Sequence, residues 1–268
     1  MDVQAWSGSD DPMGMLDAIR GVAAERKLRL FSFALCQRLR FTPDSVKDGR
    51  EFLARAEQLF DAPPRPPGWA LEATEEEIAQ DPDTWYSLED DVCGRFDLAW
   101  SGFLEADSTP IEWEGNLAFT DAVMDSWAAT TILGTLCAED PWAGAREAAE
   151  VAVTLALRKA IQSGQPCSAA EAGMVAAARV DVCRVLREVF GQPFRSVAIN
   201  PDWLAWGDGT VPKLARRVYD DRRFDLLPIL ANALEEAGCT NEDVLTHCHS
   251  PGPHVRGCWV VDAVLGRK

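Results

Sequence analysis

The sequence has few of the residues on which common catalytic motifs depend. It contains three histidines and two tyrosines in 268 residues. It lacks the glycine-rich loops that bind phosphates or dinucleotides, and it contains no His-Glu-x-x-His motif, no Gly-x-Ser-x-Gly elbow and no Cys-x-x-Cys pair. These absences argue against the common nucleotide-binding enzymes, serine hydrolases and zinc proteases. We therefore regard an enzymatic role as uncertain and expect a non-enzymatic one.

Long apolar runs and targeting features are also missing. The longest weakly polar run, residues 128–138, is far shorter than the roughly 20 residues that a membrane-spanning helix needs. The first residues lack the basic and apolar regions of a secretory signal, and there is no Asn-x-Ser/Thr sequon. The eight cysteines are scattered as reduced thiols usually are. We expect a soluble, cytoplasmic protein that does not bind membranes.

Basic residues are scarce in the middle of the chain. The net charge is −17, and residues 51–180 carry 24 acidic and only 7 basic side chains. Within them, residues 72–91 hold nine acidic side chains and no basic one. An anionic surface repels phosphate backbones, so we expect no nucleic-acid partner. The acidic region is either a solubilising surface or a docking face for a basic protein partner.

Helical periodicity is what the sequence does contain. Asp11 and Pro12 are typical of a helix start. Residues 25–40 combine apolar side chains at helical spacing with five basic ones, which is typical of a half-buried helix or a partner-binding segment. Two alanine-rich stretches, 143–161 and 168–190, run up to glycine and proline residues that end helices.

Short helical stretches alternate with tight turns in the last third. One helix is expected over 209–221, and the next closes on Gly238. A short helix follows with Thr240 as its N-cap, and a final one begins near Pro253. This pattern predicts an all-α protein of packed short helices whose C-terminal third forms α-solenoid-like helical hairpins.

Three segments are expected along the chain. They are an N-terminal helical segment (1–62), an acidic helical middle (69–195) and a C-terminal helical hairpin segment (196–268). The alternative is that all three segments form one continuous domain. A proline cluster at 63–68 separates the first two, because it cannot continue a helix.

All three histidines lie in one stretch, "THCHSPGPHVRGCW" (246–259). Zinc prefers four tetrahedral ligands from cysteine and histidine. On a final helix that begins near Pro253, His254 and Cys258 would share one face. Together with His247 at the end of the preceding helix and Cys239 just after Gly238, they form the predicted ligand set of a structural zinc site: Cys239, His247, His254 and Cys258.

Neighbouring residues offer variants of this site. His247 and His249 diverge on a helix, so we expect only one of them to point inward. Cys248 is a substitute ligand. A separate carboxylate site for a divalent metal can be drawn among Glu112, Glu114, Asp121 and Asp125, although such pairs arise by chance in an acidic region.

Three interpretations of the cluster stay open. The first is the structural zinc site, and the second is an ordinary helix junction with buried cysteines and a hydrogen-bonded histidine. The third is a thiol–imidazole catalytic pair. If His247, His254 and Cys258 leave one metal position open, the protein is a metal-dependent, hydrolase-like enzyme instead.

Four segments resemble a known family: "AAERKLRLFSFALCQRLR", "VCRVLREVFGQPFRSV", "LARRVYDDRRFDLLPILANALEEAGC" and "GPHVRGCWVVDAVLG". They are similar to multicopy helical proteins of planctomycetes and related bacteria, which often occur with the repeat-companion domain. The resemblance implies a helical fold without a known activity. The family's closing pattern includes the positions of Cys239, His247, His254 and Cys258. Its first segment usually holds two or three cysteines, whereas only Cys36 is present here, which argues against a metal or redox role there.

Taken together, these features favour a helical protein-interaction or regulatory module with an unknown protein partner and a zinc site near its C-terminus.

Overall fold

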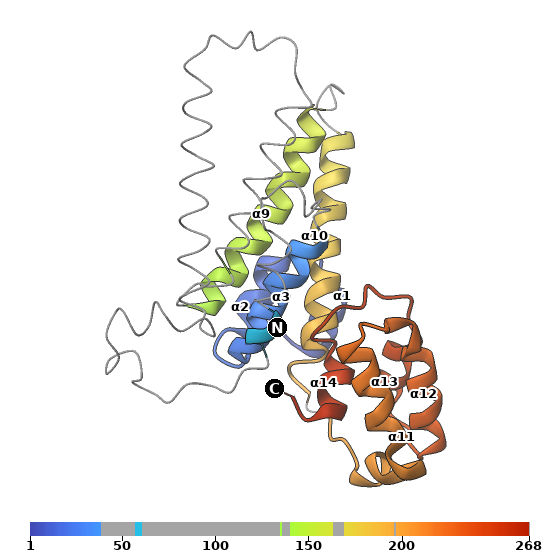
Figure 1. The fold of residues 1–268 in the computed structure, drawn as a ribbon. Helices are drawn as coiled ribbons and strands as arrows, with labels where there is room; N and C mark the ends of the chain where they lie inside the picture. The colour runs from blue at the N-terminus through green and yellow to red at the C-terminus, as the bar shows by residue number, and fades with distance from the viewer. Residues whose placement is uncertain (39–56, 61–134, 136–139, 163–168, 196, 268) are drawn as a thin grey trace, which may run out of the picture. The chain divides into compact units, whose positions relative to one another are not determined.

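The computed structural model describes residues 1–38, 57–60, 135, 140–162, 169–195 and 197–267 (Figure 1). Most of these residues lie in helices and none of them lies in a β-strand, so the prediction of a helical protein is confirmed for them. None of the helices described is long and apolar enough to cross a membrane. The predictions made for 63–68, 72–91 and the carboxylates between 112 and 125 fall outside the described residues.

The chain divides into two compact units. The first joins Met1–Ala34 with Arg179–Lys268, and the second is Leu35–Ala178. The division into 1–62, 69–195 and 196–268 stays a prediction.

Three short helices form the N-terminal part: α1 (Val3–Gly8), α2 (Pro12–Ile19) and α3 (Glu25–Arg38). The predicted start of α2 is confirmed, with Asp11 as its N-cap residue and Pro12 in its first turn. The Asp11 carboxylate forms no capping bond and pairs with Arg179 at 3.0 Å. Trp6 of α1 is fully buried, and its indole N–H donates to the Gly191 carbonyl at 2.8 Å.

Two long helices match the alanine-rich stretches, α9 (Pro141–Gln162) and α10 (Ala169–Phe190). The C-terminal half of α10 belongs to the first unit, where it buries an apolar stripe. This stripe consists of Val182, Val185, Leu186 and Val189.

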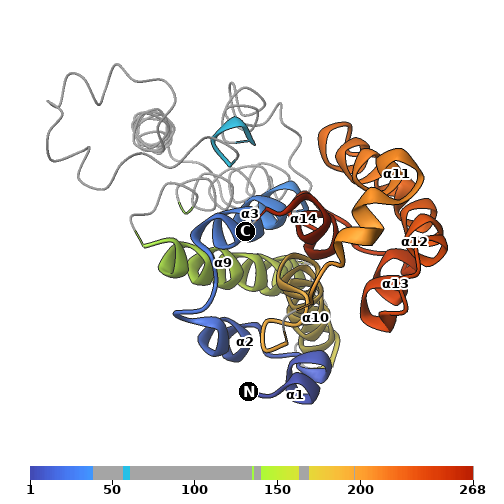
Figure 2. The same cartoon turned by 90° about the horizontal axis from the view of Figure 1, so that it is seen from below.

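The C-terminal helices are α11 (Pro201–Asp220), the 3-10 turn η1 (Phe224–Leu226), α12 (Leu227–Glu236), α13 (Glu242–His249) and α14 (Trp259–Leu265). α11 packs against both α12 and α14, while α13 contacts α12 and α14 (Figure 2). They enclose one apolar core, whose fully buried members include Val211, Leu227, Leu230, Leu234, Val244 and Val260. α11 starts earlier than the predicted 209–221 and contains a non-helical break at 206–209.

Two further predicted helix starts are wrong. The N-cap of α13 is Asn241, whose side-chain oxygen accepts from the N–H groups of Asp243 and Val244, so Thr240 is not the cap. The last helix begins at Trp259 and not near Pro253. Residues 251–258 are non-helical because Gly252 and Gly257 have φ values of +90° and +95°, which break the helical backbone. His254 and Cys258 therefore do not share a helix face.

Candidate metal centre

Four potential metal ligands from separate segments meet in the first unit: Glu188, His247, His254 and Cys258. One ligand atom from each lies within 4.8 Å of all the others. The Glu188 side chain is 4% exposed, those of His247 and His254 are 15% and 9% exposed, and Cys258 is buried. Among the described residues, these four side chains form the group of potential ligands that could hold a metal ion.

Local structure explains where each ligand lies. Glu188 is in the last turn of α10 and His247 in the last turn of α13. Cys258 is the N-cap residue of α14, so its position is set by the start of that helix. His254 lies on the intervening loop, where Gly252 makes room: a Cβ on Gly252 would lie 2.6 Å from the backbone nitrogen of His254.

The separations between ligand atoms are close to those around a tetrahedral ion. The His247 Nε2 lies 3.2 Å from Cys258 Sγ and 3.3 Å from Glu188 Oε2. The His254 Nδ1 lies 3.2 Å from the same Glu188 oxygen. Zinc bonds of about 2.0–2.3 Å at tetrahedral angles place neighbouring ligand atoms about 3.3–3.6 Å apart. Two ligand atoms at the upper limit of 4.8 Å would have to approach each other by about 1 Å when the metal ion binds.

The hydrogen-bond geometry of His254 indicates that a proton or a metal ion lies between its ring and Glu188. The Nε2 atom lies 2.9 Å from the Ser250 carbonyl oxygen, which can only accept, so Nε2 carries a proton. In a neutral ring the Nδ1 atom then has only a lone pair, and it faces both Glu188 oxygens at 3.2 and 3.3 Å. Two acceptors this close repel unless a proton or a metal ion lies between them.

No family model matches this chain, and no solved structure matches it. The resemblance to the multicopy helical family therefore stays a prediction.

Burial and the Glu188 charge set the proton affinities of the cluster. Burial, followed by the Glu188 charge, raises the pKa of the Cys258 thiol well above its usual value, although the backbone N–H groups of Val261 and Val260 act the other way. Burial lowers the pKa of His247. Burial also acts to lower the pKa of His254, but its hydrogen bond and charge interaction with Glu188 outweigh this and raise that pKa. Without a metal, the expected state is a neutral thiol, a neutral His247 and a proton held between His254 and Glu188.

The cluster contains three of the four predicted ligands: His247, His254 and Cys258. Cys239 is buried but is not part of it; its backbone N–H donates to the Leu234 carbonyl at the end of α12. Cys248 is fully buried outside the cluster, and burial raises its thiol pKa to about 12. His249 is exposed, which confirms that only one histidine of the pair points inward.

Glu188 was missed by sequence reasoning. The one signal for it is a carboxylate among the buried apolar positions of α10, between Leu186 and Val189. A buried carboxylate needs a partner of opposite charge or a metal ion, so its place on an apolar stripe is itself unusual.

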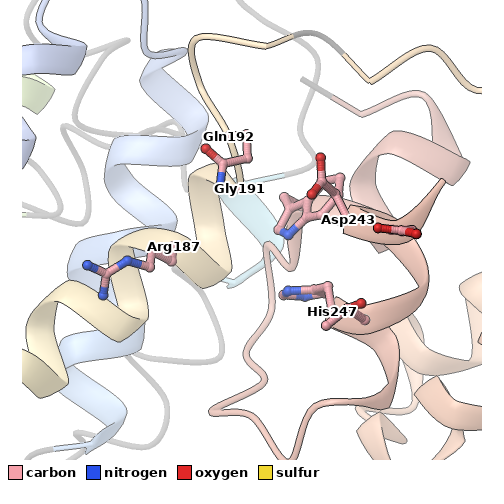
Figure 3. Close-up of a pocket in the computed structure, with 8 residues that line it drawn as sticks. Arg187, Gly191, Gln192, Asp243 and His247 are labelled. Carbon is pink, nitrogen blue, oxygen red and sulfur yellow. The ribbon is translucent and has the colours of Figure 1, made fainter. Parts of the chain in front are cut away.

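A pocket opens beside His247 (Figure 3). Its lining includes Gly191, Gln192, Asp243 and Trp259. The Trp259 ring lies against the His247 imidazole, with centroids 5.2 Å apart. Arg187 also borders the pocket, but its guanidinium points away and donates to the carbonyls of Trp6 and Ser9 (Figure 3). His247 is thus the ligand that solvent reaches most easily.

Proposed function

We propose that this protein is a helical interaction or regulatory module whose first unit is stabilised by a structural zinc ion. The ligands are Glu188 Oε2, His247 Nε2, His254 Nδ1 and Cys258 Sγ. The observation that carries the proposal is the orientation of His254, whose Nε2 is committed to a carbonyl while Nδ1 faces a carboxylate. A zinc ion between Nδ1 and Glu188 removes the repulsion between the two acceptors.

The donor set favours zinc over the other common metals. Two imidazole nitrogens, one thiolate and one carboxylate oxygen suit a tetrahedral, borderline-soft ion, whereas Mg²⁺ and Ca²⁺ prefer oxygen ligands alone. The surroundings also fit a metal site. The second nitrogen of His254 is held by the Ser250 carbonyl, and Glu188 Oε1 accepts from the Val255 N–H at 3.3 Å.

We propose protein binding as the broader role, with a partner of unknown identity. A site closed by four protein ligands stabilises a fold and has no position for a substrate. We propose that the C-terminal helices form solenoid-like hairpins, which is supported by the packing of α11 on α12 and of α12 on α13. A cytoplasmic location fits the described cysteines, which form no disulfide among themselves.

The test is the metal content of tag-free, full-length protein. We expect about one zinc ion per chain in the wild type and its loss, with a lower melting temperature, in Cys258→Ser. Cys239→Ser is the matched control, because it removes a buried thiol outside the cluster and should keep the metal. Cobalt substitution should give the intense visible absorption of a tetrahedral site and a sulfur-to-cobalt charge-transfer band. A metal-free wild type that melts like Cys258→Ser would refute the proposal.

The alternative is a metal-dependent hydrolase with three protein ligands and a bound water. The pocket beside His247 favours it, because this pocket gives a water molecule or substrate a path to the ion. Azide added to the cobalt-substituted protein distinguishes the two. An open position binds the anion and changes the visible spectrum, whereas a closed four-ligand site leaves the spectrum unchanged.

A further inference from the structure

A largely buried lysine of α3, Lys27, lies next to the backbone that carries two of the ligands. The Lys27 side chain is only 12% exposed. Its ammonium lies 2.5 Å from Asp262 Oδ2 and donates to the carbonyl oxygens of Gly257 at 2.8 Å and Val189 at 3.0 Å. An ammonium has three N–H donors, so each of them has an acceptor.

These acceptors adjoin the proposed ligands. Val189 directly follows Glu188 at the end of α10, and Gly257 directly precedes Cys258. Asp262 lies one turn into α14, where its N–H donates to the Cys258 carbonyl at 2.9 Å. One ammonium therefore ties together two backbone segments that are far apart in the sequence.

A second contact from α3 holds the same loop. Leu30, one helical turn after Lys27, lies against Gly257. A Cβ added to Gly257 would be 3.0 Å from the nearest side-chain carbon of Leu30. Gly257 also has a φ of +95°. The backbone before Cys258 is thus pressed against α3 at the point where Lys27 binds it.

Neutralising Asp262 does not require Lys27. Arg26 Nη1 also pairs with Asp262 Oδ2, at 2.9 Å, and Arg26 Nη2 donates to the Tyr219 hydroxyl at 2.8 Å. The bonds to the Val189 and Gly257 carbonyls are what Lys27 adds, and they link the backbone next to Glu188 with the backbone next to Cys258.

We infer that Lys27 is a positioning residue for the metal site, holding the Glu188 and Cys258 segments at binding distance before the metal arrives. The inference rests on the proposed zinc site. A preorganised site loses less conformational entropy on binding, so Lys27 acts on metal affinity without touching the metal.

The experiment compares the zinc affinity of full-length variants by competition with a chromophoric chelator. Lys27→Met keeps most of the side-chain volume and removes the ammonium, and we expect its affinity to fall about tenfold to a hundredfold. Lys213→Met is the matched control: Lys213 also donates to a backbone carbonyl, that of Asp208 at 2.7 Å, but its side chain is exposed, and α11 carries none of the ligands. Its zinc affinity should equal that of the wild type.

A second variant, Lys27→Arg, tests the inference if Lys27→Met does not fold. Lys27→Arg keeps the positive charge beside Asp262, but a planar guanidinium cannot direct its donors at the same three acceptors. We expect its affinity to fall as well, with a weaker sulfur-to-cobalt band. Wild-type affinity in either folded variant, whatever its stability without metal, would overturn the inference while leaving the zinc site standing. A wild type that binds no zinc would refute the proposed function, and the inference with it.

Discussion

Single residues decide what the cluster can bind. The Glu188 carboxylate is 4% exposed and meets two histidines and the Val255 N–H. A carboxylate this buried is stable only with a partner that offsets its lost hydration. His254 supplies that partner as an imidazolium, or a metal ion does so once none of the four ligand atoms carries a proton.

The proton balance predicts that zinc affinity depends on pH. Burial and Glu188 raise the pKa of Cys258 well above its usual value, so the metal-free thiol is protonated at neutral pH and zinc must displace that proton. Glu188 raises the pKa of His254, so a second proton competes once the pH falls below that raised value. We expect the apparent affinity to rise about tenfold per pH unit where one proton is released, and more steeply where two are.

Chelator competition at several pH values between 6 and 8.5 measures this slope. Cys239→Ser should keep the slope of the wild type, because that thiol lies outside the cluster. An affinity that does not change with pH would mean that no thiolate binds the ion.

At the scale of helices, the ends and junctions position the site. α10 ends at Phe190, and the next residue, Gly191, has a φ of +60° that turns the chain away. The Trp259 ring of α14 packs directly on this glycine, and Trp259 follows the ligand Cys258. A glycine at the end of one helix thus allows the start of another helix to approach.

Gly191→Ala is expected to destabilise the protein strongly. A Cβ would lie 2.6 Å from the Trp259 ring, and alanine disfavours the left-handed backbone. The backbone term costs about 1–2 kcal/mol and the overpacking about 1–3 kcal/mol more.

Gly238→Ala separates the backbone cost from the cost of overpacking. Gly238 has a φ of +89°, but a Cβ there meets nothing within 4 Å. It should lose only the backbone term of about 1–2 kcal/mol in the free energy of unfolding, measured by urea denaturation. Equal losses in the two variants would show that Trp259 does not pack on Gly191.

At the scale of the whole molecule, the first unit joins the two ends of the chain. Trp6 bonds to Gly191, Lys27 bonds to the segments around Val189 and Gly257, and Arg26 pairs with Asp262. A metal at Glu188, His247, His254 and Cys258 would link α10, α13 and α14 within the same unit. Its binding free energy would then contribute directly to folding.

Removal of zinc should therefore lower the stability of the loaded protein. A free zinc concentration of a thousand times the Kd stabilises the folded state by about 4 kcal/mol, and a chelator removes that contribution. Thermal unfolding with and without chelator measures the shift. His247→Ala should melt at one temperature under both conditions, and a wild type insensitive to the chelator would exclude a structural metal.

Local chemistry made several features predictable. Asp11 and Pro12 predict the start of α2, and the alanine-rich stretches predict α9 and α10. The divergence of residues two apart on a helix predicts that only one of His247 and His249 points inward. Each of these depends on residues a few positions apart.

The sequence by itself thus determined the helical character, most of the helices seen in the described residues and three of the candidate ligands. Only the tertiary structure decided that Glu188 completes the cluster in place of Cys239, that residues 251–258 are not helical and that Lys27 bonds beside two ligands. These features join segments distant in the chain, and helical periodicity carries no information about which buried faces meet.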